Sequence, residues 1–433
     1  MKNDQQASHG QGATRRGFLQ GSAAAVLGAT GTLAWQRAVH AAGSDILKVG
    51  LIGCGGRGTS AAVNALRADP NTRLTVMADI FRDRLEQSRR ILARQPVADR
   101  VQVPDENCFD DFDCYKRVME SDVDVVLLCT PPHFRPAHLE AAVQAGKHIF
   151  CEKPVAVDAP GVGKVLQTVE LARQKGLTIV SGLCWRYDLG VLETMKRIHD
   201  GAIGEIITIQ ENYLTGTLWH RGRQPHWSEM EYQIRNWLYF TWLSGDHIVE
   251  QHVHSLDKAL WIMKDQPPKL CYGLGGRQVR TGPEFGNIYD HFAVCYEWPN
   301  GTRAFAYTRQ MANCFNETED YVWGTNGTAR VLANTIEPRS GTAWRYTGDR
   351  PSMYDLEHQA LFSALREGRT INNGVYMAYS TMMAIMGREA CYTGQVITWE
   401  KAMQSTVDLS PAKYEWGDVV VPPVAIPGKT TWS

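Results

Sequence analysis

The chain has no stretch dominated by charge of one sign. Its 433 residues include 45 Lys and Arg against 46 Asp and Glu, which gives a formal net charge of −1. A nucleic-acid partner or a membrane surface normally requires a basic patch, so neither is a favoured partner. The sequence also lacks internal repeats and low-complexity segments, which excludes a repeat architecture. With 44% hydrophobic residues, the chain is long enough for two domains with buried cores.

Cysteine and histidine spacings that bind zinc are missing as well. None of the ten cysteines shows CxxC spacing, and there is no HExxH sequence. Cys54, Cys129 and Cys151 each fall at an end of an apolar, strand-like run, where a small buried thiol is expected. We therefore predict no metal and no cysteine framework.

The first 41 residues have the composition of an export signal. The sequence Thr14-Arg15-Arg16-Gly17-Phe18-Leu19-Gln20 precedes an apolar stretch at 22–34, and small residues follow at 39–41. This pattern resembles a bacterial twin-arginine signal, which predicts recognition by the twin-arginine export machinery and a periplasmic location. A membrane anchor is the alternative, but the apolar stretch is short for a span, so cleavage of residues 1–41 is favoured and no stable membrane insertion is expected.

A glycine-rich turn follows the first apolar strand after this signal. Residues 47–52 are typical of a buried strand, and Gly53-Cys54-Gly55-Gly56-Arg57-Gly58 comes directly before a helical stretch at 59–66. A second strand at 73–78 ends at Asp79, 21 residues after Gly58. A strand, GxGxxG, a helix and an acid at this offset together predict a dinucleotide site.

In such a site the glycines let the backbone approach a pyrophosphate, and the helix N-terminus supplies N–H donors. The residues predicted to contact the cofactor in this turn are Gly53, Gly55, Gly56, Arg57 and Gly58. Asp79 would accept hydrogen bonds from the adenosine ribose, and its charge would repel a 2′-phosphate, which favours NAD. Arg82 and Arg84 follow closely, so NADP stays open as the second cofactor.

Strands and helices continue to alternate up to residue 184. Strands are expected at 123–130, 147–151 and 177–182, and helices at 137–145 and 161–174. This alternation is typical of an α/β fold with a parallel sheet, and we assign residues 42–184 to a Rossmann domain. Ligands bind at the carboxyl ends of such strands. The residues expected to contact the cofactor there are Thr130, Pro131, His133, Glu152 and Lys153.

Together these motifs resemble the glucose–fructose oxidoreductase/inositol dehydrogenase (Gfo/Idh/MocA) family. The resemblance is carried by the glycine turn, Asp79, Thr130-Pro131-Pro132-His133, Ala145-Gly146-Lys147-His148 and Glu152-Lys153-Pro154, in this order. It implies that residues 185–433 form an α+β domain with an open, mostly antiparallel sheet, used for substrate binding and oligomerisation. It also implies a homo-oligomer and a catalytic role for Lys153 beside the nicotinamide.

The segment 244–257 is the richest in polar side chains. As one continuous helix, it would place Val249 and Val253 on an apolar stripe and its acids and histidines on the opposite side. A solvated polar face would give the same pattern. The segment is similar to the family's catalytic sequence, an acid, three residues and a histidine, with a further acid three residues on. The resemblance implies catalytic roles for Glu250 and His254 and substrate contact for Asp257.

This segment departs from the family pattern at two positions. Glu250 stands where the family usually has Asp, and His252 stands where it usually has Gly. The identity of the substrate therefore cannot be inferred from the family. A metal shared by His247, Glu250 and His254 is the competing interpretation, but the spacing is not that of a zinc helix.

Aromatic residues gather between the two predicted domains. Five of the thirteen tryptophans lie between residues 185 and 242, interleaved with His and Arg. Such a segment suits the C–H faces and hydroxyls of a carbohydrate, and it equally suits a packed surface or an oligomer contact. The candidate substrate contacts are Arg186, Tyr187, Trp219 and His220.

These residues predict an NAD(P)-dependent oxidoreductase that acts on a secondary hydroxyl of a sugar, glycoside or polyol. His254 would act as the general base, and Lys153 would stabilise the developing alkoxide. Since no free NAD pool exists outside the cytoplasm, an exported enzyme would carry a tightly bound, recycled cofactor. A redox-neutral glycoside hydrolase or epimerase and a non-catalytic sugar-binding protein stay open as alternatives.

Overall fold

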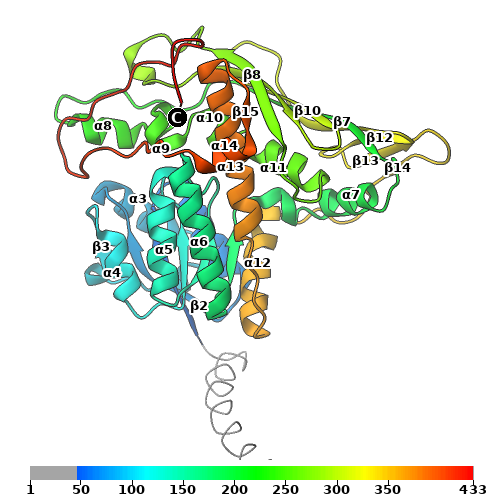
Figure 1. Cartoon of the computed structure of the whole chain (residues 1–433). Helices are drawn as coiled ribbons and strands as arrows, with labels where there is room; N and C mark the ends of the chain where they lie inside the picture. The colour runs from blue at the N-terminus through cyan, green and yellow to red at the C-terminus, as the bar shows by residue number, and fades with distance from the viewer. Residues whose placement is uncertain (1–45, 433) are drawn as a thin grey trace, which may run out of the picture.

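The computed structural model describes residues 46–432, so the predicted signal at residues 1–41 lies outside the described residues. Two sheets organise the described part of the chain. In Figure 1 the first sheet and its helices form the lower part, in blue and cyan, and the second sheet lies above it to the right, in green and yellow.

The first sheet contains six parallel strands in the order β3-β2-β1-β4-β5-β6. These strands are β1 (Leu47–Ile52), β2 (Thr72–Ala78), β3 (Cys108–Phe109), β4 (Val125–Leu128), β5 (His148–Cys151) and β6 (Ile179–Ser181). The helices that alternate with them are α2 (Gly56–Ala68), α3 (Arg82–Leu92), α4 (Cys114–Glu120), α5 (Arg135–Gln144) and α6 (Ala159–Lys175). The four residues of β4 are all buried, because helices cover both faces of the sheet. The strand order reverses between β1 and β4, which creates a crevice at their carboxyl ends.

The second sheet contains nine strands and is mostly antiparallel, with one parallel pair, β7 and β10. Its strands are β7 (Ile206–Thr215), β8 (Leu270–Gly276), β9 (His291–Glu297), β10 (Arg303–Gln310), β11 (Glu317–Gly324), β12 (Gly327–Arg330), β13 (Thr335–Pro338), β14 (Trp344–Arg345) and β15 (Ile397–Thr398). The expected turn at Pro299-Asn300-Gly301 joins β9 to β10, and Gly301 adopts a φ of +86° there. The predicted fold class is confirmed.

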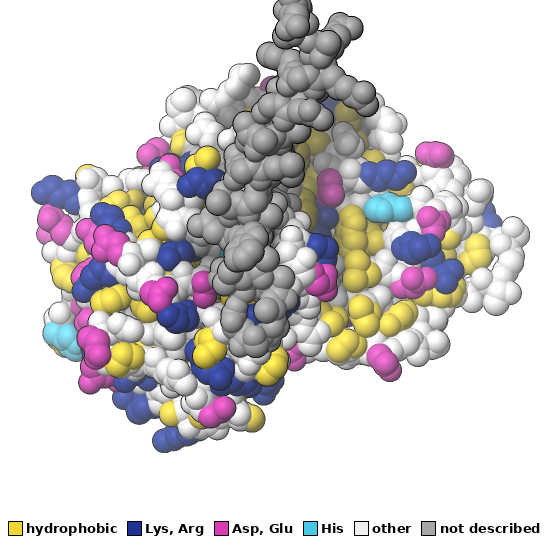
Figure 2. Space-filling model, turned by 90° about the horizontal axis from the view of Figure 1, so that it is seen from below, with side chains coloured by type: hydrophobic (Ala, Val, Ile, Leu, Met, Phe, Trp, Pro, Cys, Tyr) yellow, Lys and Arg dark blue, Asp and Glu magenta, His cyan; other side chains and the backbone are white. Residues whose placement is uncertain are grey.

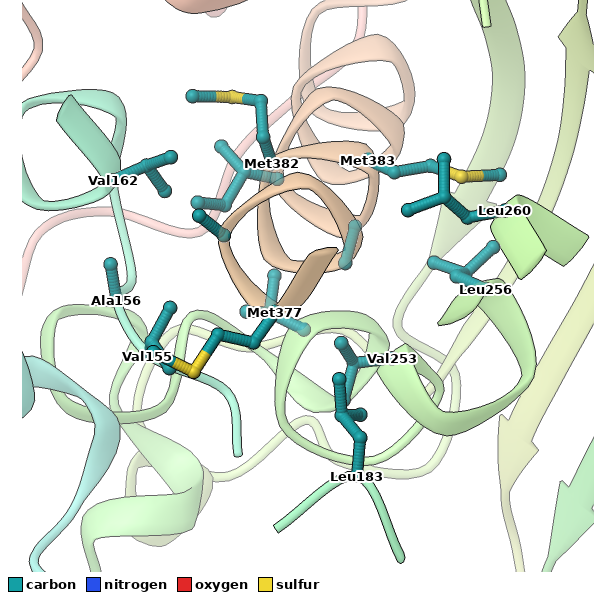
Figure 3. Packing of buried hydrophobic residues seen from close by; sticks show 14 of the residues in the cluster. Val155, Ala156, Val162, Leu183, Val253, Leu256, Leu260, Met377, Met382 and Met383 are labelled. Atoms are coloured by element: carbon teal, nitrogen blue, oxygen red, sulfur yellow. The ribbon is translucent and has the colours of Figure 1, made fainter. Parts of the chain in front are cut away.

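One long helix, α13 (Gly374–Thr393), connects the cores of the two parts. It packs against α6 of the first domain and against α11 (Val253–Ile262) and β8 of the second. In Figure 3 Met377 points toward Val155, whereas Met383 points toward Leu260. Buried residues from both sheets therefore belong to one continuous hydrophobic cluster.

The face of the second sheet that these helices leave uncovered carries large apolar side chains. Along β10, Ala304 and Ala306 are buried on the covered face, while Phe305 and Tyr307 alternate with them and point outward. The exposed side chains of this face, which we call the open face, include Tyr272, Leu274, Phe305, Tyr307 and Trp323. Strand alternation thus gives the sheet one core face and one unpaired aromatic face.

The first domain is not formed by one continuous stretch of the chain. The expected boundary at residue 184 falls between β6 and α7 (Leu189–His199), but α12 (Met353–Arg366) returns to the first domain and packs on α2. Arg366 bonds to Asp69 at 2.6 Å, and Asn64 donates to Asp355 at 2.6 Å. These contacts between distant residues leave no local signal in the sequence.

Several simpler expectations concern the surface and the thiols. All ten cysteines are free. Cys54 and Cys151 are buried as expected, whereas Cys129 is partly exposed and lines the cavity between the domains. No helix among residues 46–432 is both long and apolar enough to cross a membrane. On the face shown in Figure 2, positive and negative side chains are interspersed.

Candidate active site

A cavity of about 350 Å³ lies where the carboxyl ends of β1, β2, β4 and β5 face the second domain. From the first domain its lining includes Gly53, Asp79, Thr130, Glu152 and Lys153. From the second domain it includes Ile234, Trp237, Glu250 and His254. The cavity is therefore large enough for a small-molecule ligand and lies at the switch point of the parallel sheet.

The glycine turn contributes to the lining of this cavity, and close backbone contacts require a glycine at Gly53 and at Gly58. Gly53 has a φ of +95°, and a Cβ there would lie 2.6 Å from the carbonyl carbon of Cys129. A Cβ on Gly58 would lie 1.8 Å from the Gly53 carbonyl oxygen, so this glycine lets α2 pack closely on β1. Around Gly55 and Gly56 the space is open, and Gly56 begins α2. The turn thus offers a helix N-terminus with room for phosphates, and it fits a dinucleotide.

Asp79 lies at the end of β2 beside this turn. Its carboxylate accepts hydrogen bonds from the Cys54 N–H at 2.6 Å and the Phe81 N–H at 2.9 Å, which fix its orientation. Burial raises the pKa of Asp79 despite these two bonds. Of the two nearby arginines, Arg84 lines the cavity, whereas Arg82 pairs with Glu86 at 2.9 Å outside it.

Two arginines hold the strand-end loops together. Arg57 forms ion pairs with Glu152 and, at 3.1 Å, with Glu357 of α12. Arg135 donates to the carbonyl oxygens of Thr130, at 2.6 Å, and Pro154. Burial alone would raise the pKa of Glu152, but Arg57 and Arg135 bring it below its ordinary value. Glu152 therefore remains an anion that anchors the glycine turn next to Lys153.

Lys153 reaches across from the first domain to Glu250 of the second. Its ammonium donates to the Glu250 carbonyl oxygen at 2.6 Å and lies 3.2 Å from the Glu250 Oε1 atom. The single helix expected over residues 244–257 is interrupted here, because α10 (His247–Glu250) ends before α11 begins at Val253. A helix end leaves carbonyl groups without helical partners, and this one faces the ammonium of Lys153.

His254 follows on the first turn of α11 and lines the same cavity. Burial, reinforced by the positive charges of Lys153, Lys258 and Arg57, lowers its pKa well below the ordinary value. Its Nδ1 atom is buried and has no hydrogen-bond partner among the described residues. The imidazole is therefore neutral at neutral pH and is available to accept a proton.

The solvated-face interpretation of this segment is wrong. Val249 and Val253 are buried as expected, but the opposite side is buried too, since His247 and Asp257 are at most 1% exposed. Among residues 46–432 no group of three or more His, Cys, Asp or Glu side chains is placed to hold a metal ion.

The structure does not bring three of the predicted substrate residues to the cavity. Arg186 forms a bidentate ion pair with Asp257, with Nη2 2.9 Å from Oδ1, and also bonds to Asp265 at 2.6 Å. The Tyr187 hydroxyl donates to Asn373 at 2.7 Å. Arg186 and Asp257 thus belong to an ion-pair network that fixes α11, Tyr187 is bonded to the residue before α13, and none of the three is among the residues that line the cavity.

Trp219, His220 and His133 are also not among the residues that line the cavity. Trp219 packs near Trp237, with ring centroids 6.0 Å apart, and His220 bonds to the Glu284 carbonyl oxygen at 3.1 Å. His133 is buried against Trp242, and burial lowers its pKa to about 4. The contacts of Trp219 and His220 agree with the packed-surface interpretation, and His133 is held by the rings around it rather than directed into the cavity.

Sequence reasoning missed Phe81, Phe112 and Arg135 as lining residues. Phe81 follows Asp79 by two residues and Arg135 follows Thr130 by five, so proximity to a recognised motif was the available signal. Phe112 has no such signal and reaches the cavity only through folding. Arg84, considered for its effect on the choice of cofactor, and Trp237, one of the five clustered tryptophans, both line the cavity.

The fold and the cavity together define a protein of the NAD-binding Rossmann class. A family model described as "Oxidoreductase family, NAD-binding Rossmann fold" matches residues 47–183, and a second, "GFO/IDH/MocA C-terminal domain", matches residues 191–330. The chain belongs to the Gfo/Idh/MocA family.

Its relatives of known name share limited identity. The chain is 28% identical over 211 residues to 2,7-anhydro-N-acetylneuraminate hydratase of Escherichia coli, a match of 48% of this chain and only 51% of that protein. It is 25% identical over 320 residues to inositol 2-dehydrogenase of Rhizobium meliloti, covering 72% of this chain and 82% of the relative. The structure of scyllo-inositol dehydrogenase from Lactobacillus casei with bound NAD(H) and scyllo-inositol matches with a TM-score of 0.63 at 18% identity, over 82% of this chain and 99% of that one.

We predict that Asp79 selects NAD against NADP. Asp79→Ala removes the carboxylate that would repel a 2′-phosphate and leaves Arg84, so the ratio of the NADP and NAD dissociation constants should fall by about tenfold or more, which is about 1.4 kcal/mol. Titration calorimetry with each dinucleotide measures this ratio. Asp110→Ala, an exposed carboxylate outside the cavity, is the control. An unchanged ratio in Asp79→Ala would show that selection lies elsewhere.

Proposed function

We propose that the protein oxidises a secondary hydroxyl of a sugar, glycoside or polyol with a tightly bound NAD. The observation that carries this proposal is the meeting of Lys153, Glu250 and His254 in the same cavity as the glycine turn and Asp79. A binding protein would need no neutral base beside an ammonium, which argues against the non-catalytic alternative.

The chain's own part in the reaction is proton transfer and charge stabilisation. NAD, when bound, supplies the hydride acceptor. His254, neutral because its pKa is lowered, takes the proton from the substrate hydroxyl as the C–O bond gains double-bond character. The ammonium of Lys153 stabilises the negative charge that develops on that oxygen.

Glu250 acts mainly on Lys153. The carbonyl and carboxylate oxygens of Glu250 both contact the Lys153 ammonium, and no hydrogen bond joins its carboxylate to His254 among the described residues. This arrangement positions the ammonium and balances its charge, so Lys153 stays directed into the cavity. Glu250 is thus a positioning residue in this mechanism.

A redox-neutral reaction is the second candidate, and one observation favours it. Two relatives, at 28% and 24% identity, are named 2,7-anhydro-N-acetylneuraminate hydratase, and hydration involves no net change of oxidation state. His254 as the base and the ammonium of Lys153 would serve equally in a transient oxidation that is followed by return of the hydride. The two candidates differ in whether reduced cofactor or a second reduced product accumulates.

Export through the twin-arginine route remains a proposal that rests on the sequence of residues 14–41. It favours a cofactor that is inserted before export and returned to its starting state in each catalytic cycle. We therefore predict that mature protein recovered from the periplasmic fraction releases close to one NAD per chain on denaturation, measured by enzymatic cycling. Protein that is empty and takes up neither added NAD nor NADP would contradict the hydride mechanism.

We predict that His254→Ala and Lys153→Met each lower kcat by about 100-fold or more, because each removes one element of proton transfer or charge stabilisation. NAD content should stay unchanged, since neither residue holds the glycine turn. The assay follows reduced nicotinamide or sugar products across inositols, aldoses and glycosides. His226→Ala, at an exposed histidine outside the cavity lining, is the control.

The pH dependence of the wild type follows from the same group. A histidine accepts a proton only above its pKa, and burial lowers that pKa below 6.5, so kcat/KM should stay level down to about pH 6.5 and fall only below it. A fall in kcat/KM centred above pH 6.5, or full activity in both His254→Ala and Lys153→Met, would exclude His254 as the base.

We also propose that a second copy of the chain covers the open face of the second sheet. Its exposed aromatic side chains form an apolar surface on a flat sheet, the kind of surface that subunits bury. Phe305→Lys with Tyr307→Lys should lower the oligomer mass in light scattering, whereas Val375→Lys, at an exposed position on α13, should not. A wild-type monomer would contradict this proposal.

A further inference from the structure

The C-terminal segment after α14 (Trp399–Gln404) crosses from the second domain over the first. Residues 405–432 contain no helix or strand, and in Figure 1 this red segment runs beside α8 (Glu229–Arg235) and α9 (Thr241–Ser244). The Leu409 N–H donates to the Asp158 carboxylate at 3.0 Å, and the Tyr414 hydroxyl lies 2.8 Å from the His133 Nε2 atom. Both anchors are in the first domain.

Two aromatic side chains of this segment pack on the outside of the cavity wall. The Trp416 ring stacks on Phe81 with centroids 5.7 Å apart and lies 4.9 Å from the ring of Phe112. Tyr414 lies 6.4 Å from Phe112 and 6.2 Å from Phe134. Phe81, Phe112 and Phe134 line the cavity, so Tyr414 and Trp416 form a second layer behind them.

The same segment then bonds to the opposite wall. The Gly417 carbonyl accepts from the Met230 N–H at 2.9 Å, and the Val419 carbonyl accepts from the Gln233 side chain at 3.2 Å. Met230 and Gln233 belong to α8, the helix that carries Ile234 into the cavity lining. Residues 408–419 therefore tie the first-domain wall to the second-domain wall.

The position of this crossing identifies the part of the cofactor beneath it. Phe81 follows Asp79 by two residues, and an acid at this place in a Rossmann fold holds the adenosine ribose. A further link closes this end, since Arg235 bonds to Asp83 at 3.0 Å and lies over the Phe81 ring at 3.8 Å. The segment thus lies over the adenosine end of the site, away from Lys153 and His254.

We propose that residues 408–419 form a strap that retains the adenosine end of the dinucleotide. The rings of Tyr414 and Trp416 are its contacts with the first-domain wall of the cavity. Release of the cofactor requires the strap to detach, because it joins both walls of the cavity. Tyr414 and Trp416 are 46% and 48% exposed, so the strap can open locally without unfolding either domain. This inference rests on the proposed use of bound NAD and explains how it is kept through repeated cycles.

The test is the rate at which NAD leaves the full-length mature protein. Protein loaded with labelled NAD is chased with excess unlabelled NAD and sampled by rapid filtration. Tyr414→Ala with Trp416→Ala should release NAD at least about tenfold faster, because two aromatic contacts are lost. Val420→Ala, in the same segment but 85% exposed, is the matched control and should release NAD at the wild-type rate.

A measurement on the unaltered protein guards against misfolding of the double variant. Amide hydrogen exchange in residues 408–419 should slow when NAD binds, since a filled cavity supports the wall on which the strap packs. Unchanged exchange, or equal release rates in wild type and double variant, overturns the strap while NAD binding stands. A wild-type protein that takes up no NAD overturns the proposed function, and the strap with it.

Discussion

The contact between the ammonium of Lys153 and Glu250 is the interaction on which the site depends. Lys153 follows β5 of the cofactor domain, whereas Glu250 ends α10 of the second domain, so this charged contact joins the two domains at the cavity. Its geometry requires the helix interruption at residues 251–252, which frees the Glu250 carbonyl. Arg57, Glu152 and Arg135 then hold the loop before Lys153 in place.

The cofactor half could be predicted from the sequence because its determinants are local. A buried strand, a glycine turn and an acid at a fixed offset are constraints within one stretch of chain, and β1 has the predicted bounds of 47–52. Glu250 and His254 were identified through the resemblance of their segment to the family's catalytic sequence, because periodicity alone fitted a solvated face equally well. Lys153 joins them because the carboxyl ends of parallel strands meet at one edge.

The remaining site could not be predicted, because it depends on contacts between distant residues. Asp257 has the spacing of a functional acid, yet Arg186, which also pairs with Asp265, engages it inside the protein. Trp219 has the composition of a sugar contact but packs on other aromatic rings. Conversely, Phe112 has no motif, and only the fold brings it to the cavity. Side-chain chemistry indicates what a residue can do, and packing decides whether it meets a ligand.

The methionine-rich helix α13 has a mechanical consequence. Because its side chains fill one core that includes residues of both sheets, rotating one domain against the other would open that core to water. Hinge closure of the two domains is therefore disfavoured, and the scaffold keeps Lys153 and His254, the proposed catalytic groups, at a fixed separation. We expect ligands to enter through the movement of surface segments that make few contacts. The rigid pair of domains meanwhile keeps Lys153 and His254 pre-organised.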